Sequence, residues 1–430
     1  MSALKEISAN VGAFTTLTSS TIENSGDLTT NQFQLIPTVP SLGYTLTSSD
    51  DAGNATWTKT QYRAYVQKAP KINFNTIIQS FVVSSDGGMI LACYGVFGAP
   101  IAQFQTFLYT SGAWVLDSTI TTPLTANASV GLTLSDQNDL LSVRHVTNPN
   151  QLVVYRRIAG AWVQVGDMID LGTTNVFFGR GSVINSEKQM QAITTDLGVS
   201  FYAIGASTVT FVGALTIASR SNLVISNDFL TLVTPNIVGG SFGNAAVYVR
   251  AASDPLMAWS LLQTITPLSV TGQFFGQTLA ISANGSTLAV AMLKENLNAP
   301  ASVGTTGAVL MFKYVTGVGF VQGQKIVPVD YSYQTTTLDF GISIQLSYAG
   351  DTLVVGGYLD QAQLGSLWVY VRNNRGLWIQ NGNKLRGNDL TLANAQQGRG
   401  AGLAKGNASI VVSVVINGIS TTQSAIVIFQ

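Results

Sequence analysis

The side chains that most often carry out catalysis are scarce in this 430-residue chain. A single histidine, His145, disfavours a hydrolase with a serine or cysteine triad, and a zinc site of histidine and cysteine lacks its ligands. We interpret His145, at the end of a predicted strand, as a surface or capping residue. Paired carboxylates that could cleave a glycoside remain possible among the 21 Asp and Glu residues, but no pair is marked by its spacing. We therefore predict a non-enzymatic protein without catalytic residues, metal or cofactor.

The only cysteine, Cys93, lies in the apolar run Met89–Cys93. A free cysteine in such a run is typical of a protein core. Because one cysteine cannot form a disulfide within the chain, stability must come from packing, as in proteins made in a reducing compartment.

The charge balance and the chain start exclude several classes of partner. Lys plus Arg and Asp plus Glu number 21 each, so no net field attracts nucleic acid or anionic lipid. The start, Met1–Glu6, lacks the basic and apolar regions of a secretory signal, and no stretch of apolar residues is long enough to span a membrane. We expect a protein made in a host cytoplasm.

The composition favours an all-β protein. Apolar residues make up 46% of the chain and charged residues only 10%, while 42 glycines accompany abundant Ser, Thr, Asn and Gln. Strands and tight turns use this mixture, whereas exposed helices are normally rich in Glu, Lys and Arg.

A hairpin motif recurs along the chain. Each copy is an apolar strand, usually ending in Ser, then a short turn of Asp, Asn or Gly, then a second apolar strand. The seven copies span Phe81–Tyr94, Leu132–Val143, Ser182–Thr194, Leu223–Val233, Leu279–Val290, Ile344–Val355 and Gly402–Val415. Successive copies lie about 41 to 65 residues apart, and a third strand and a fourth strand with an aromatic residue follow in most. Four strands per unit at this period indicate a seven-bladed β-propeller.

The two ends of the repeat region predict how the ring closes. The last unit stops after its third strand, Ala425–Phe429, whereas the segment Ala64–Ile72 before the first unit is similar to the fourth strands of other units. We therefore predict that the strand near Tyr65 pairs with the last strand and leaves no open sheet edge at the seam.

Several blades resemble FG-GAP-type propeller repeats, the class found in integrin heads. The resemblance rests on Phe275–Gly276, Ser282–Val290, Gly307–Val309, Phe340–Gly341 and Gly350–Gly357. That family often binds calcium in acidic loops, but the blade carboxylates here are isolated, so calcium binding is not implied.

Residues 1–60 differ from the repeat region 61–430. They are rich in Thr, Ser and Asn with few apolar residues, so they cannot form a core alone and either stay mobile or associate with copies of themselves or a partner. The stretch Gly43–Trp57 resembles a segment common in phage tail-fibre and giant-virus structural proteins. We expect an extended, fibre-like segment for anchoring or oligomerisation.

Loop length predicts a binding face. In an antiparallel propeller the first-to-second and third-to-fourth connections share one face, and they are short here. The long connections Met292–Thr306 and Val327–Leu338 fall on the opposite face, where we expect recognition by Tyr331 and Tyr333. Two other segments have an arginine between two glycines, Gly179–Gly181 and Gly398–Gly400. Either their arginines form a positive ring near the axis, or their glycines serve only to let the blades approach closely.

The sequence thus predicts a surface protein of a virus particle that attaches to a host glycan or protein. Residues 1–60 would bind other virion proteins or further copies of the chain. A glycan-binding propeller lectin, and then a propeller glycosidase, remain as alternatives.

Overall fold

The structure is a computed structural model, and the chain divides into two compact units, Met1–Thr60 and Gln61–Gln430. The residues that it describes are 44–48, 55–59, 65–67, 70–94, 101–125, 130–145, 150–170, 181–196, 198–217, 222–238, 241–252, 258–267, 274–293, 306–330, 338–388, 395–416 and 424–430. In the first unit, β1 (Tyr44–Ser48) and β2 (Ala55–Lys59) form an antiparallel hairpin.

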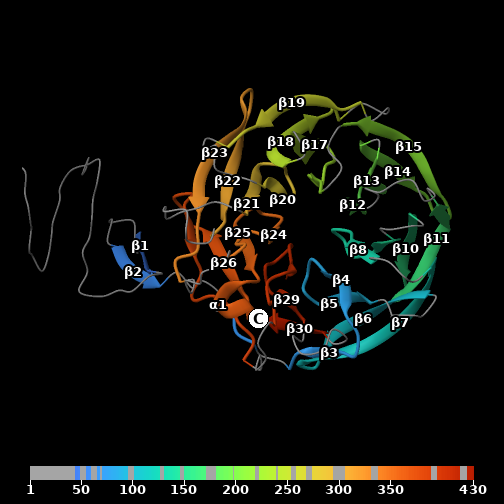
Figure 1. The fold of residues 1–430 in the computed structure, drawn as a ribbon, viewed down its shortest axis with the longest axis horizontal. Coiled ribbons are helices and arrows are strands. Elements are labelled where there is room, and N and C mark those ends of the chain that lie inside the picture. Colours follow the sequence, from blue (N-terminus) through green and yellow to red (C-terminus); the bar gives the residue numbers. More distant parts are fainter. Residues whose placement is uncertain are drawn as a thin grey trace, which may run out of the picture. The chain divides into compact units, whose positions relative to one another are not determined.

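The second unit is a seven-bladed β-propeller, as predicted (Figure 1). Each blade is a four-stranded antiparallel sheet whose first strand lies nearest the axis. Blades 1 to 3 consist of β4 (Ile78–Val83), β5 (Met89–Tyr94), β6 (Ile101–Thr110) and β7 (Ala113–Thr125); β8 (Val130–Leu134), β9 (Leu140–His145), β10 (Gln151–Ile158) and β11 (Ala161–Asp170); and β12 (Ser182–Asn185), β13 (Met190–Thr195), β14 (Gly198–Ile204) and β15 (Val209–Thr216).

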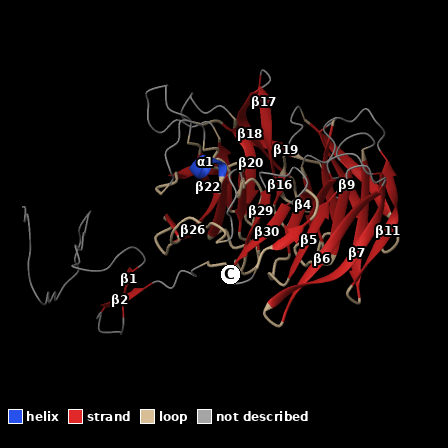
Figure 2. Ribbon diagram, turned by 60° about the horizontal axis from the view of Figure 1, so that its bottom comes forward, coloured by secondary structure: helices blue, strands red, loops and turns tan. Residues whose placement is uncertain are grey.

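The remaining blades follow the same plan, and blade 7 takes its fourth strand from the start of the unit. Blades 4 to 7 consist of β16 (Val224–Ile225), β17 (Thr231–Val238), β18 (Ser241–Val249) and β19 (Ser260–Ile265); β20 (Phe275–Ile281), β21 (Thr287–Met292), β22 (Ala308–Val315) and β23 (Gly319–Ile326); β24 (Ser343–Leu346), β25 (Thr352–Gly357), β26 (Ser366–Arg372) and β27 (Trp378–Gln380); and β28 (Ala401–Leu403), β29 (Val411–Ile416), β30 (Ser424–Phe429) and β3 (Ile72–Phe74). The short helix α1 (Asp360–Gln363) follows β25 and precedes β26 along the chain of blade 6, and it is drawn in blue in Figure 2.

The predicted closure of the ring is confirmed. β3 pairs with β30, with Ile72 opposite Ile426, and the pairing continues through a bridge between Gln67 and Phe429. The backbones of Val66 and Gln430 also exchange two hydrogen bonds of 3.1 and 3.0 Å. The two ends of the propeller unit are therefore joined within one sheet.

The recurrent serine has the same physical role in the five hairpins that contain it. Its buried hydroxyl oxygen accepts a hydrogen bond from the backbone N–H five residues later, where the second strand begins, at 2.8 to 3.1 Å. The five pairs are Ser84 with Met89, Ser135 with Leu140, Ser226 with Thr231, Ser282 with Thr287 and Ser347 with Thr352. The serine hydroxyl thus closes each of these five turns from inside.

The core lies between neighbouring blades, because both faces of each middle strand are buried. In β5, Leu91 and Cys93 pack towards blade 2, whereas Ile90 and Ala92 pack towards blade 7. This explains the continuous apolar runs of these strands.

Cys93 is a free, fully buried cysteine, as predicted. His145 is also buried, 1% exposed, so the expectation of a surface position was wrong.

Hydrogen bonds between neighbouring hairpin turns form a closed ring on one face. Every one of the seven junctions has at least one such bond. In order of chain they are Ser85 N to Asn138 Oδ1 (2.8 Å), Ser186 N to Asp136 Oδ1 (3.1 Å), Asn185 Nδ2 to Asn227 O (3.1 Å), Asn227 N to Ala283 O (2.7 Å), Ala283 N to Tyr348 O (3.0 Å), Tyr348 N to Lys405 O (2.7 Å) and Gly406 N to Ser85 O (2.9 Å). We call this set the turn ring.

Glycine lets blades 6 and 7 approach closely. Gly398 has a φ of 87°, and a Cβ there would lie 2.3 Å from the Ser366 carbonyl oxygen. The close-approach interpretation of the Gly398–Gly400 segment therefore holds, and the Arg399 side chain that it carries is exposed. Arg180 in the equivalent segment lies outside the described residues.

Within the described part of the chain, no helix has the length and hydropathy to cross a membrane.

Candidate functional site

The predicted binding residues Tyr331 and Tyr333 lie outside the described residues, in the interval 331–337. Both flanks of their loop are described, up to Asp330 and from Leu338. The connections between β23 and β24, between β25 and β26, and between β27 and β28 all fall on the face opposite the turn ring, because the strands alternate in direction. We call this the long-connection face, and the three connections named here lie next to blade 6 in the chain.

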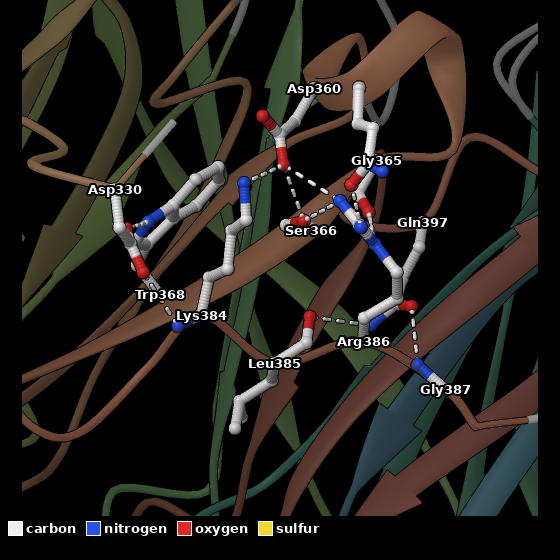
Figure 3. Close-up of polar contacts among 11 residues, drawn as sticks. Asp330, Asp360, Gly365, Ser366, Trp368, Lys384, Leu385, Arg386, Gly387 and Gln397 are labelled. Carbon is white, nitrogen blue, oxygen red and sulfur yellow. Dashed lines mark hydrogen bonds and ion pairs between the residues drawn. The ribbon is translucent and has the colours of Figure 1, made fainter. Parts of the chain in front are cut away.

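A buried carboxylate forms the centre of this region (Figure 3). Asp360 begins α1 and is fully buried. Its Oδ2 accepts hydrogen bonds from Lys384 Nζ at 2.7 Å, Arg386 Nη2 at 2.9 Å and Ser366 Oγ at 2.7 Å. A carboxylate without water needs such donors, because desolvation of an unpaired charge costs several kcal/mol.

A second carboxylate fixes the start of the loop that carries Tyr331 and Tyr333. Asp330 Oδ1 accepts a hydrogen bond of 2.6 Å from Trp368 Nε1, and Oδ2 accepts one of 3.0 Å from the backbone N–H of Lys384. The Lys384 ammonium lies 5.8 Å from the centre of the Trp368 ring, within the range of a cation–π interaction. Asp330 is therefore tied to the same lysine that binds Asp360.

A buried tyrosine, Tyr370, also contacts the chain just before Asp330. The Tyr370 hydroxyl donates a hydrogen bond of 3.3 Å to the carbonyl oxygen of Val327. Burial, with a smaller contribution from the negative charge of Asp330, raises the pKa of Tyr370 above its ordinary value. The hydroxyl therefore stays protonated and can act as a donor.

Arg386 joins the third connection to the second, and Gln397 cross-links the third connection internally. Arg386 Nε donates to the Gly365 carbonyl at 3.2 Å, and Nη1 is hydrogen-bonded to the side chain of Gln361. Gln397 accepts from the Gly387 N–H at 3.0 Å and donates to the Leu385 carbonyl at 3.2 Å. Three connections are thus cross-linked by side chains; we call Asp330, Asp360, Lys384 and Arg386 with their partners the blade 6 network.

The chemistry of this network suits positioning better than reaction. Two carboxylates face two cations, so the formal charge balances, and both carboxylates are already occupied by donors. A general base or nucleophile needs an atom free to reach a substrate. Among the described residues, no group of three His, Cys, Asp or Glu could hold a metal ion.

The sequence did not single out these four charged residues. Asp330, Asp360, Lys384 and Arg386 come from three separate connections with no regular spacing. The available signal was local: charged residues are rare in this chain, and these four lie in connections rather than in exposed strands.

Comparisons with known proteins agree on the architecture. No protein-family model matches the sequence, and neither does any curated protein. Among solved structures, hydrazine synthase of Kuenenia stuttgartiensis is similar at a TM-score of 0.52 and 11% identity, over 81% of this chain and 95% of that one. A proposed 6-phosphogluconolactonase of Bacteroides fragilis is similar at 0.50 and 14% identity, over 80% and 90%. The likeness shows the fold alone. The FG-GAP and fibre resemblances gain no support from it.

Proposed function

We propose that this chain is a non-enzymatic recognition protein that binds its partner through the long-connection face around blade 6. The observation that carries the proposal is the blade 6 network, which fixes the flank of the loop 331–337 through Asp330. Loops on a rigid scaffold commonly carry recognition. A loop with a fixed flank also loses less conformational entropy when it binds, which favours affinity.

The biological setting that we propose is a virus particle. Residues 1–60 would anchor the propeller to other virion proteins or to copies of itself, and the partner of the propeller would be a host surface glycan or protein. This part depends on the resemblance of Gly43–Trp57 to fibre proteins, and the blade motifs keep their resemblance to FG-GAP repeats. Lactone hydrolysis is not proposed, because the neighbour of that name shares only 14% identity.

The test of recognition is a loop variant of the full chain. Residues 331–337 are replaced by an equal number of Gly and Ser residues, which keeps Asp330 and its partners in place. Binding to a glycan array and to host-cell surfaces should weaken at least about tenfold, which corresponds to about 1.4 kcal/mol. The control variant is Val318→Ser, in the exposed turn between β22 and β23 on the opposite face, and it should bind as the wild type does.

Two results would contradict the proposal. Unchanged binding by a correctly folded loop variant would remove the long-connection face from recognition. Absence of the protein from purified particles, measured by quantitative mass spectrometry, would remove the virion setting. Saccharide binding by the head together with absence from particles would instead favour the lectin alternative.

A further inference from the structure

The axis of the propeller contains polar cavities that the recognition face does not use. Two cavities of about 320 and 260 Å³ share part of their lining and therefore adjoin each other. The shared polar residues are Thr133, Ser182, Asn222, Gln345, Tyr348 and Lys405. One water occupies about 30 Å³ in the liquid, so this space can hold several waters or a small ion.

Lys405 brings an ammonium group to this cavity from the turn of blade 7. Its carbonyl oxygen accepts a hydrogen bond of 2.7 Å from Tyr348 N–H, so its backbone is part of the turn ring. Among the described residues, the ammonium makes no hydrogen bond or ion pair. Burial lowers the pKa of Lys405, which means that the protein environment disfavours the charge.

Arg144 brings a second cation from β9 of blade 2. Its guanidinium lies over Gly131, where a Cβ would come within 2.6 Å of Arg144 Cζ, so a larger residue there would push the guanidinium aside. Nη1 donates a hydrogen bond of 2.7 Å to Thr133 Oγ1, and the side chain lines the smaller cavity together with Lys405. Burial lowers the pKa of Arg144 to about 10.

The single described carboxylate that lines the cavities is engaged elsewhere. Asp136 accepts a hydrogen bond of 3.1 Å from Ser186 N–H and one of 3.4 Å from Asn227 Nδ2. The described lining thus holds two cations and one carboxylate, a formal charge of +1, and the carboxylate accepts its hydrogen bonds from neutral groups of the turn ring. A net positive charge therefore remains at the cavity, where both cations are only partly exposed and charges interact more strongly than in bulk water.

We propose that this axial cavity is an oxyanion site that binds phosphate, free or as a small phosphate ester, between Lys405 and Arg144. A guanidinium offers paired donors that match tetrahedral oxyanions, and a lysine ammonium adds a point charge. Ser182, Asn222 and Gln345 supply neutral donors around it. A bound anion would offset the net positive charge of this lining. The site is independent of the recognition face, because it lies on the axis and shares no residue with the blade 6 network.

The test is calorimetric titration of the full chain with sodium phosphate at constant ionic strength. The wild type should show one saturable site, and Lys405→Met should weaken it at least tenfold, whereas Lys405→Arg should retain binding. The matched control is Lys313→Met, an exposed lysine on β22, which should bind as the wild type does. The proposal is overturned if the wild type shows no saturable binding or if Lys405→Met binds with unchanged affinity.

A second measurement uses only the wild type and so does not depend on folding of a variant. The phosphorus-31 line of phosphate should broaden in the presence of the protein and sharpen again when excess sulfate competes. A line that stays sharp would overturn the proposal. Repeating the titration with glycerol phosphate separates the two sources: equal affinity indicates a phosphate ester as ligand, and loss of binding indicates free phosphate.

Discussion

The two faces of the propeller are held together by different kinds of bond. On one face the turn ring joins all seven blades, and four of its seven hydrogen bonds join backbone groups alone. On the long-connection face, the blade 6 network joins three connections of a single region through charged side chains. The hydrogen bonds of the turn ring recur at every pair of neighbouring blades, whereas the charged network of the long-connection face is described at blade 6.

This difference has a physical basis. Backbone hydrogen bonds depend little on the side chains present, so a ring built from them tolerates turns as different as those at Ala283, Tyr348 and Lys405. A buried ion pair depends on particular residues and gains little stability over apolar packing, while the loss of one partner is costly. Such a network is therefore better explained by what it positions than by the stability that it adds.

The largest expected effect breaks the blade 6 network. Asp360→Asn should lower the free energy of unfolding by about 3–5 kcal/mol, because Lys384 and Arg386 would remain largely buried without their carboxylate. Urea denaturation measures the change. The control is Asp117→Asn, an exposed carboxylate on β7, which should change the midpoint little. Equal midpoints for the two variants would show that the network is not a linked unit.

A smaller effect is expected from the turn ring. The Asn138 side chain accepts a hydrogen bond of 2.8 Å from Ser85 N–H and donates one of 3.1 Å to Ser85 Oγ, at a φ of 64°. Asn138→Ala should cost about 1–3 kcal/mol, since the Ser85 N–H loses its partner.

Asn138→Gly separates the two causes of that loss, because glycine accepts the positive φ without strain. If the bonds between blades 1 and 2 matter, both variants lose stability in thermal unfolding. A loss confined to the alanine variant would assign the effect to the backbone conformation instead, and the turn ring would be weaker at this junction than we infer.

The repeated hairpins could be predicted from the sequence, whereas the blade 6 network could not. Serine followed by a turn recurs in five copies because its hydroxyl closes each hairpin, so the pattern reports a local bond. The closure was also predictable, because the last blade lacked a strand that the segment near Tyr65 could supply.

Contacts between distant, irregularly placed residues left no such pattern. Asp330, Asp360 and Lys384 meet only because three connections converge over blade 6. Arg144 and Lys405 belong to blades 2 and 7 and line one cavity only once the ring is closed. His145 looked like an end-of-strand surface residue, but neighbouring blades cover both faces of such a strand.

The smallest expected effect concerns the cation that the turn ring holds at the axis. Because burial lowers the pKa of Lys405 in the folded state, the unfolded chain, at its ordinary value of 10.5, binds the proton more tightly. Lys405→Met removes this penalty, so in phosphate-free buffer it should raise the free energy of unfolding, by less than the two changes above lower it.

The pH dependence distinguishes this penalty from a gain in packing. The penalty is fully present below the folded-state pKa and disappears as the pH rises towards 10.5, so the advantage of the variant should shrink over that interval. Asp136, Tyr348 and Arg144 face the same cavity but are common to both proteins, so the difference in stability isolates Lys405. If the difference in the free energy of unfolding stays constant with pH, the methionine simply packs better, and burial does not disfavour the charged ammonium of Lys405. The turn ring would then place an ordinary solvated lysine at the axis rather than one prepared for an anion.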